Sequence, residues 1–106
     1  MTMGKRDESV NWVVVYANKA VRQTSRLPKK IQEMLDLLVM EIEKCGPLRS
    51  NWPHFGPLKG KGLPEHTYHC HIKSGRPTYV SCWFIIDKKL KQVEVFYVGT
   101  HENAPY

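Results

Sequence analysis

The chain has 106 residues, a length that suits one domain with a single core and leaves no room for a second domain. Its composition, 42% hydrophobic and 25% charged, is ordinary for a soluble globular protein, and no apolar run is long enough to span a membrane. We therefore expect a soluble, cytoplasmic protein with no membrane partner. The formal net charge of +6 favours polyanionic partners, either nucleic acid or acidic proteins.

The three cysteines, Cys45, Cys70 and Cys82, form an odd set with no CxxC spacing, which indicates a reducing compartment rather than a disulfide framework. Residues 1–9 are polar and charged and lack the apolar run of a secretory signal. We expect them to be a frayed or disordered N-terminus that precedes a single domain over residues 10–106.

The first half of that domain has the pattern of one strand and two helices. The run VNWVVVY over residues 10–16 predicts an early, central strand that is buried on both sides. A short polar-faced helix is expected over residues 17–26, because the residue before Pro28 is pushed out of the helical region. Pro28 then suits the first position of a second helix. That helix has an apolar stripe, ends at Gly46-Pro47 and packs on the core; the stripe is Ile31, Met34, Leu35, Leu38, Ile42 and Cys45.

The second half has the pattern of a hairpin-linked sheet. Residues 46–64 are rich in Gly and Pro and predict a long irregular connection that carries aromatic anchors. Three strands follow, over residues 66–73, 78–87 and 91–99, and a polar tail closes the chain. The order predicts an α+β fold in which two helices cover one face of a curved, mostly antiparallel sheet and the other face stays open.

The strand over residues 66–73 combines a core side with a polar side. Side chains alternate between the two faces of a strand, so Tyr68, Cys70 and Ile72 should face the core, whereas Thr67, His69, His71 and Lys73 should share the open face. Side chains on the same face of a strand are about 7 Å apart, a spacing that suits a small anion such as a phosphate.

Metal-free RNA cleavage needs a base for the ribose 2′-hydroxyl, an acid for the leaving 5′-oxygen and cations around the phosphate. His69 and His71 suit the first two roles, because an imidazole titrates near neutral pH. His101 and Tyr106 join them only if the last strand runs beside the others. Tyr106 would then serve as acid, base or stacking surface, or, as the C-terminal residue, be disordered. The candidate phosphate-binding cations are Lys59, Lys61, Lys73 and Arg76.

Three other interpretations stay open at this point. His69 and His71 could bind zinc with His101 or Glu65, but neighbouring cations would repel a divalent ion and Cys70 points to the opposite face, so we expect no metal and no cofactor. The histidines could also be ordinary surface residues, or the chain could be a basic RNA-binding module without catalysis. His54 and His66 have no assigned role.

The order β-α-α-β-β-β resembles that of the RelE/ParE superfamily of toxins from type II toxin-antitoxin systems. So do the Leu58-Lys59-Gly60 step, the strand YHCHI over residues 68–72, and the ending VEVFYVGTH over residues 93–101 with a tyrosine shortly after it. The resemblance covers residues 10–106 and is greatest to the RelE branch. It implies the microbial RNase-like RelE fold.

The resemblance further implies an endoribonuclease that enters the A site of the 70S ribosome, cleaves mRNA without metal and so represses translation. The free toxin would be a monomer, and a cognate antitoxin would hold it inactive in a hetero-oligomer. His69 and His71 match the catalytic strand positions, His101 the basic residue of the last strand and Tyr106 the C-terminal tyrosine, a histidine-rich set similar to YafQ and HigB. Arg76 is nearest to the family's phosphate-binding arginine, but it lies in a turn. A ParE-like gyrase inhibitor is the alternative.

Overall fold

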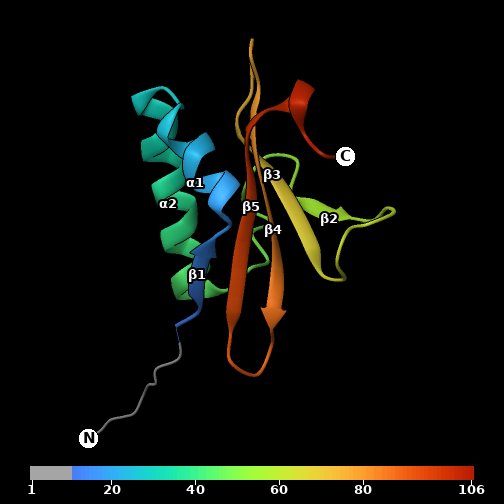
Figure 1. The fold of residues 1–106 in the computed structure, drawn as a ribbon. Helices are drawn as coiled ribbons and strands as arrows, with labels where there is room; N and C mark the ends of the chain where they lie inside the picture. Colours follow the sequence, from blue (N-terminus) through green and yellow to red (C-terminus); the bar gives the residue numbers. More distant parts are fainter. Residues whose placement is uncertain (1–10) are drawn as a thin grey trace, which may run out of the picture.

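The computed structural model describes residues 11–106 as a five-stranded sheet with two helices on one side (Figure 1). The strand order is β1-β5-β4-β3-β2; β1 is parallel to β5 and every other pair is antiparallel. The elements are β1 (Val13–Tyr16), α1 (Asn18–Ser25), α2 (Lys29–Cys45), β2 (Gly56–Leu58), β3 (Thr67–Lys73), β4 (Tyr79–Asp87), β5 (Gln92–Thr100) and the 3-10 helix η1 (His101–Asn103). The predicted α+β class is therefore confirmed, whereas the expectation for residues 1–9 lies outside the described residues. None of the described helices is long and apolar enough to cross a membrane.

Helix α2 packs its apolar stripe against the sheet. Four members of the predicted stripe are buried, whereas Cys45 at its end is exposed; the buried ones are Ile31, Leu35, Leu38 and Ile42. Pro28 occupies the cap position just before the helix rather than its first helical position. Gly46 ends the helix with a φ of 99°, which favours glycine, and a Cβ there would lie 3.3 Å from the indole nitrogen of Trp12.

Strand β1 lies at the edge of the sheet, so the prediction of a central strand buried on both sides is wrong. It pairs only with β5, and Val13 and Val15 are 51% and 43% exposed. Val14 and Tyr16 on the alternate positions pack against the core. β4 and β5 pair as a hairpin, so only one edge of β5 is left for β1. β1 takes that edge and has no strand on its own outer side. A β-branched run favours a strand, but it does not specify how many neighbours that strand has.

Part of the connection predicted to be irregular forms the short strand β2, which pairs with β3 at the other edge of the sheet. The segment before β2 is tied to α2, because Glu41 Oε1 accepts hydrogen bonds from Asn51 Nδ2 and the buried Trp52 indole, both at 2.9 Å. Arg49 adds an ion pair to the same carboxylate at 3.3 Å. The connection is therefore anchored at both ends before it reaches β3.

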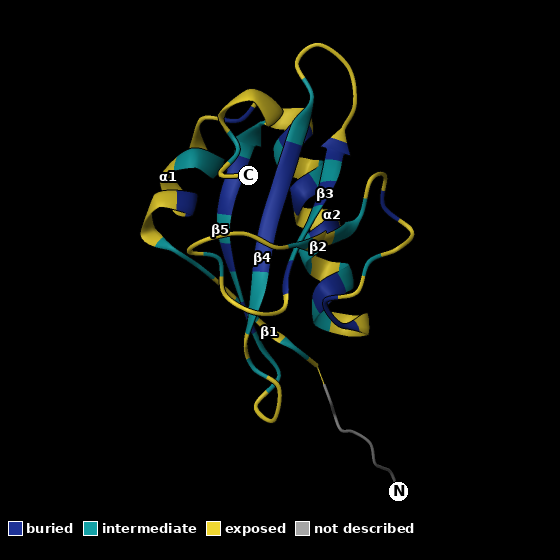
Figure 2. Cartoon of the chain, turned by 90° about the vertical axis from the view of Figure 1, so that its right-hand side faces the viewer, coloured by how far each residue is buried: buried dark blue, intermediate teal, exposed yellow. Residues whose placement is uncertain are grey.

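The two faces of β3 differ as the alternation predicts. Cys70 and Ile72 are buried in the core between the sheet and the helices, together with Trp83 of β4. Figure 2 shows a continuous buried stretch in the first half of β4, the central strand of the sheet. On the open face, Val80, Cys82 and Tyr97 form a second, smaller apolar cluster, the floor of this face; Cys82 and Val80 are the β4 partners of His69 and His71.

Candidate active site

Four imidazoles and one phenol meet on the open face of the sheet. The rings of His71 and His101 are 5.5 Å apart between centres, and those of His69 and Tyr106 are 4.8 Å apart. His101 also contacts Tyr106, with ring centres 5.7 Å apart. The structure thus brings the four predicted catalytic residues into one group, and His54 joins them. We call this group the histidine cluster: His54, His69, His71, His101 and Tyr106.

His69 and His71 enter the histidine cluster from alternate positions of β3. His69 Nδ1 lies 3.1 Å from the carbonyl oxygen of Gly56 on β2. A carbonyl only accepts hydrogen bonds, so Nδ1 carries the proton and Nε2 of the neutral ring is a free acceptor. His71 Nδ1 is buried and has no hydrogen-bond partner among residues 11–106. The His69 ring is therefore held by a hydrogen bond, whereas the buried nitrogen of the His71 ring has none.

His54, which had no assigned role, stacks on His71 with ring centres 4.1 Å apart and an interplanar angle of 23°. The Pro53 carbonyl accepts a 2.8 Å hydrogen bond from the His71 backbone N–H, and Gly56 pairs with His69. His54 lies between these two attachments with a φ of 56°. Sequence reasoning missed it because the contact depends on the β2–β3 pairing, which no local pattern indicates.

His101 and Tyr106 come from the segment that leaves β5. The His101 backbone N–H donates to the Thr78 carbonyl at 2.9 Å, and the Tyr97 hydroxyl donates to the Thr100 carbonyl at 2.6 Å. Gly99 permits this arrangement, since a Cβ there would lie 2.7 Å from the Tyr97 oxygen. The turn of η1 then reverses the chain, and Ala104 packs on the floor of the open face. Tyr106 thereby returns to His69.

Burial controls the protonation of these groups. Desolvation lowers the pKa of His71 below its usual 6.5, and the nearby His54, His101 and His69 lower it further. Desolvation also lowers the pKa of His69, partly offset by its bond to Gly56. Both rings are therefore neutral at neutral pH and able to accept a proton. Desolvation raises the pKa of Tyr106 to about 12, so its hydroxyl keeps its proton and can donate a hydrogen bond.

A cavity of about 580 Å³ opens beside the histidine cluster. His71, His101 and Arg76 line it, and Thr78, Thr100 and Glu102 complete its wall with the turn residues Gly75 and Pro77. We call it the catalytic cavity. It places a permanent cation next to two imidazoles, an arrangement that suits a phosphate.

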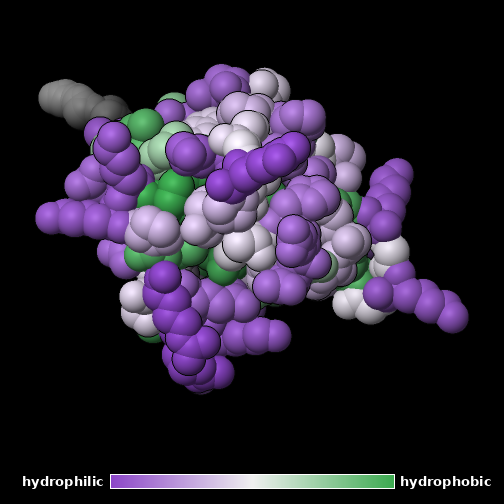
Figure 3. All heavy atoms as spheres, turned by 90° about the horizontal axis from the view of Figure 1, so that it is seen from above, coloured by the Kyte–Doolittle hydropathy of each residue, from purple (hydrophilic) through white to green (hydrophobic). Residues whose placement is uncertain are grey.

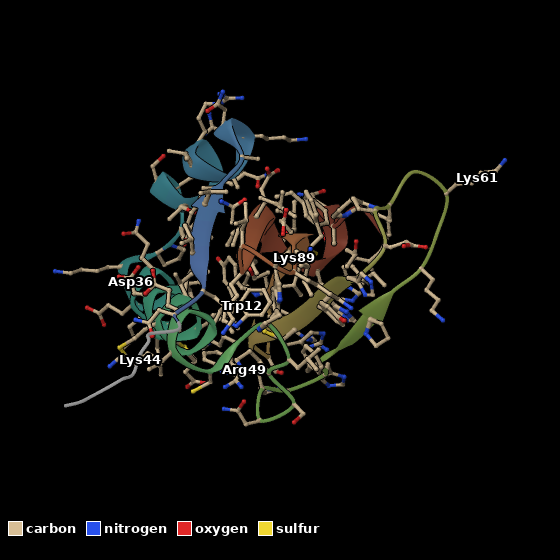
Figure 4. The ribbon with its side chains drawn as sticks, turned by 90° about the horizontal axis from the view of Figure 1, so that it is seen from below. Trp12, Asp36, Lys44, Arg49, Lys61 and Lys89 are labelled. Carbon is tan, nitrogen blue, oxygen red and sulfur yellow. The ribbon has the colours of Figure 1, made fainter. Side chains whose placement is uncertain are left out.

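The three predicted lysines lie apart from one another. Lys73 is at the end of β3, beside the hairpin turn, where its Nζ approaches Gly75. Lys59 lines a different hollow with His66, in the loop between β2 and β3. Lys61 projects from that loop, away from the body of the molecule (Figure 4). Of the four predicted cations, only Arg76 lines the catalytic cavity.

The described residues contain no group of three or more His, Cys, Asp or Glu side chains arranged to hold a metal ion. Cys70 and Cys82 are fully buried in the two apolar clusters, and burial raises the pKa of both thiols to about 12. They are protonated thiols that pack as small apolar side chains. The ionisable side chains at this face include the imidazoles and the phenol of the histidine cluster, the Arg76 guanidinium and the Glu102 carboxylate.

No family model and no curated protein matches the chain. Among solved structures, it is similar to a free mutant form of the E. coli toxin RelE, with a TM-score of 0.65 and 20% identity over 90% of this chain and 88% of that one. YafQ in the E. coli DinJ-YafQ toxin-antitoxin complex gives a TM-score of 0.69 and 14% identity over 92% and 100%. The Staphylococcus aureus YoeB dimer gives 0.65 and 15% over 87% and 99%. The chain therefore has the fold of the RelE toxins.

Proposed function

We propose that the protein is the toxin of a toxin-antitoxin system and that it cleaves mRNA as a metal-independent endoribonuclease on the ribosome. The observation that carries the proposal is the histidine cluster itself, in which two imidazoles of lowered pKa meet an exposed imidazole beside Arg76. The fold supports it, because the similar structures are toxins, several of them in complex with antitoxins.

In the proposed reaction, His71 is the general base. Its lowered pKa keeps it neutral, and it lines the catalytic cavity. It takes the proton of a ribose 2′-hydroxyl, and the 2′-oxygen attacks the adjacent phosphorus. The bond from phosphorus to the 5′-oxygen breaks, and His101 donates the proton that this oxygen needs. The products are a 2′,3′-cyclic phosphate and a 5′-hydroxyl.

The remaining groups stabilise and orient the phosphate. Arg76 lines the cavity and can pair two guanidinium N–H groups with two phosphate oxygens. The Tyr106 hydroxyl remains protonated and can donate a hydrogen bond, and the Tyr106 ring contacts the rings of both His69 and His101. His54 stacks on His71 and fixes the plane of this ring, which is the proposed general base. Such preorganised donors are worth most in the transition state, where the phosphate charge is greatest.

The proposed partners follow from charge and from the fold. A net charge of +6 on 106 residues favours binding to ribosomal RNA and mRNA. An antitoxin is the proposed protein partner because structures of RelE with RelB and of YafQ with DinJ share this fold. We propose that antitoxin binding blocks the open face and keeps the bound toxin from RNA.

The test is to incubate the purified protein with mRNA, with and without translating ribosomes, and to map the RNA ends. We expect cyclic-phosphate ends, which mark attack by the 2′-oxygen, and a loss of about 10²- to 10⁴-fold in rate for His71→Ala or His101→Ala. His66→Asn is the matched control, because His66 is exposed, lies outside the histidine cluster, and has a φ of 60° that asparagine tolerates.

The other outcomes identify the alternatives. Growth arrest on expression with intact RNA, unaffected by either histidine variant, would replace the proposal with a ParE-like action on gyrase. Salt-sensitive RNA binding without any cleavage would reduce the protein to an RNA-binding module.

A further inference from the structure

A second cavity, larger than the catalytic one, lies on the other side of the segment that leaves β5. Its volume is about 680 Å³, and it shares Thr100 with the catalytic cavity. Asn103 and Pro105 of the C-terminal segment form part of its wall, while His101 and Glu102 of the same segment line the catalytic cavity. The two cavities are therefore neighbours separated by a few residues of chain. We call the second one the α1 cavity.

The α1 cavity exists because β5 is longer than β1. The four residues of β1 pair with Gln92–Val95, so residues 96–100 have no strand beside them on that edge. Helix α1 follows β1 directly and packs against β5 there. A helix beside a strand edge leaves open space that a paired strand would fill, and the side chains of α1 form its outer wall.

Helix α1 and its C-cap residue, Arg26, present a polar, cationic stripe to this cavity. Lys19, Gln23 and Arg26 are spaced by four and three residues and line the cavity together. Both Lys19 and Arg26 are exposed, and no carboxylate is among the lining residues. The remaining walls include the aromatic side chains of Tyr79 and Phe96 and the amide of Asn103. Figure 3 looks down on this end of the molecule, where hydrophilic residues cover most of the surface.

The edge of β5 in this cavity lacks a free backbone N–H at Val98 for pairing with another strand. The Val98 backbone N–H, which faces α1, already donates a 3.0 Å hydrogen bond to Gln23 Oε1. An added peptide strand would have to displace that bond. Exposed cations, amides and aromatic rings around one open cavity suit a single-stranded nucleic acid, whose phosphates pair with cations and whose bases stack on rings.

We propose that the α1 cavity binds the stretch of single-stranded RNA that flanks the cleaved phosphodiester on one side. Lys19 and Arg26 contact its phosphates, and the aromatic and amide groups contact its bases. The proposal rests on the proposed function, because the RNA reaches this cavity from the histidine cluster over Thr100. It makes the enzyme sensitive to substrate length in one direction only.

The experiment measures binding rather than cleavage. The full chain is titrated with an RNA trinucleotide that has a 2′-deoxy sugar at the scissile position, and with the same RNA extended at its 5′ or its 3′ end. We expect one of the two extensions to tighten binding, and Lys19→Ala/Arg26→Ala to lose that gain. With about 0.7 released counterions per phosphate contact, the slope of log affinity against log salt for the extended RNA should fall by about 1.4.

Lys88→Ala/Lys89→Ala is the matched control. It removes the same charge from the turn between β4 and β5, at the opposite end of the molecule from the C-terminal segment (Figures 1 and 4). This variant should keep the gain from the extension. The proposal is overturned if neither extension tightens binding, or if the Lys19/Arg26 variant keeps the gain. It is also overturned if a glutamate-rich peptide binds the same two cations more tightly than the RNA does.

The experiment distinguishes a failure of this proposal from a failure of the proposed function. Cleavage of the all-ribose RNA by the wild type tests the histidine cluster alone. Cleavage with a length dependence that ignores Lys19 and Arg26 would reject the α1 cavity and keep the nuclease. Length-dependent binding through these two residues without cleavage would reject the nuclease and keep the cavity.

Discussion

The two faces of β3 alternate residue by residue, yet they contact entirely different surroundings. Cys70 and Ile72 are 0% and 1% exposed and lie in the core beneath the helices. His69 and His71 are only partly buried and meet the loop before β2 and the segment after β5. Stability should therefore depend on one face and chemistry on the other, even at adjacent positions.

The separation is not complete, because the open face is itself partly desolvated. Val80, Cys82 and Tyr97 form an apolar floor under the histidines, and burial is the largest cause of the lowered pKa of His69 and His71. Burial removes part of the hydration of these rings and thereby keeps them neutral and able to accept a proton. The difference between the two faces can be tested by substitutions on each face and at Glu41, which ties α2 to the segment before β2.

The largest expected effect comes from adjacent substitutions on β3. Ile72→Ala removes buried methyl groups and leaves a cavity, so it should lower the free energy of unfolding by about 2–5 kcal/mol. His71→Ala removes a ring that has no hydrogen bond at its buried nitrogen, so its cost should stay below about 1 kcal/mol. Urea denaturation of both variants, followed by circular dichroism, measures the difference.

Activity should show the reverse order when it is measured well below the unfolding transition. Ile72→Ala protein that is still folded should cleave RNA at a rate close to that of the wild type, whereas His71→Ala should not. If His71→Ala were the less stable of the two, the open face would be part of the core and the comparison would fail.

The smaller expected change is at Glu41, which connects the two faces. Its carboxylate accepts bonds from Asn51 and Trp52, and these bonds lower its pKa and hold the segment that carries His54. Hydrogen bonds to a charged acceptor are worth more than those to a neutral one, so Glu41→Gln should cost about 1 kcal/mol of unfolding free energy. The measurement is the shift in urea midpoint. Glu33→Gln, at an exposed position of the same helix, should cost less than about 0.5 kcal/mol.

Local pattern predicted what depends on one element at a time. The period-two alternation of β3 separated Cys70 and Ile72 from His69 and His71, and the helical spacing identified the buried stripe of α2. Both follow from where side chains point along a regular backbone, and each element must bury its apolar side. The fold class followed from the order of these elements.

Features that depend on pairing between distant segments were not accessible in the same way. The edge position of β1 and the existence of β2 are set by which strands meet, and His54 reaches His71 only through the pairing of β2 with β3. The direction of Lys61 depends on the path of an exposed loop. The contacts of His101 with His71 and of Tyr106 with His69 were conditional on the placement of β5, because a sequence pattern does not show which strands are neighbours.

The smallest effect concerns pH and tests the desolvation of the open face. The pKa values of His69 and His71 are lowered from 6.5, so the unfolded chain binds more protons than the folded one as the solution is acidified. Their contribution to stability is therefore fully present above about pH 6.5 and is lost as the pH falls through the lowered values. Urea midpoints measured from about pH 7 to about pH 5 should decrease, and less so for His69→Gln/His71→Gln.

Glu41 supplies an internal reference for that titration. Its pKa is lowered from 4.5, so its contribution is lost only below that pH, and the Glu41→Gln variant should lack this second decrease while keeping the first. The two losses are thus separable by pH and by variant. A midpoint that rose between about pH 7 and about pH 5 would mean that the imidazoles gain protons on folding. His71 would then be cationic in the folded protein, the proposed base would be occupied, and the roles of His71 and His101 would have to be exchanged.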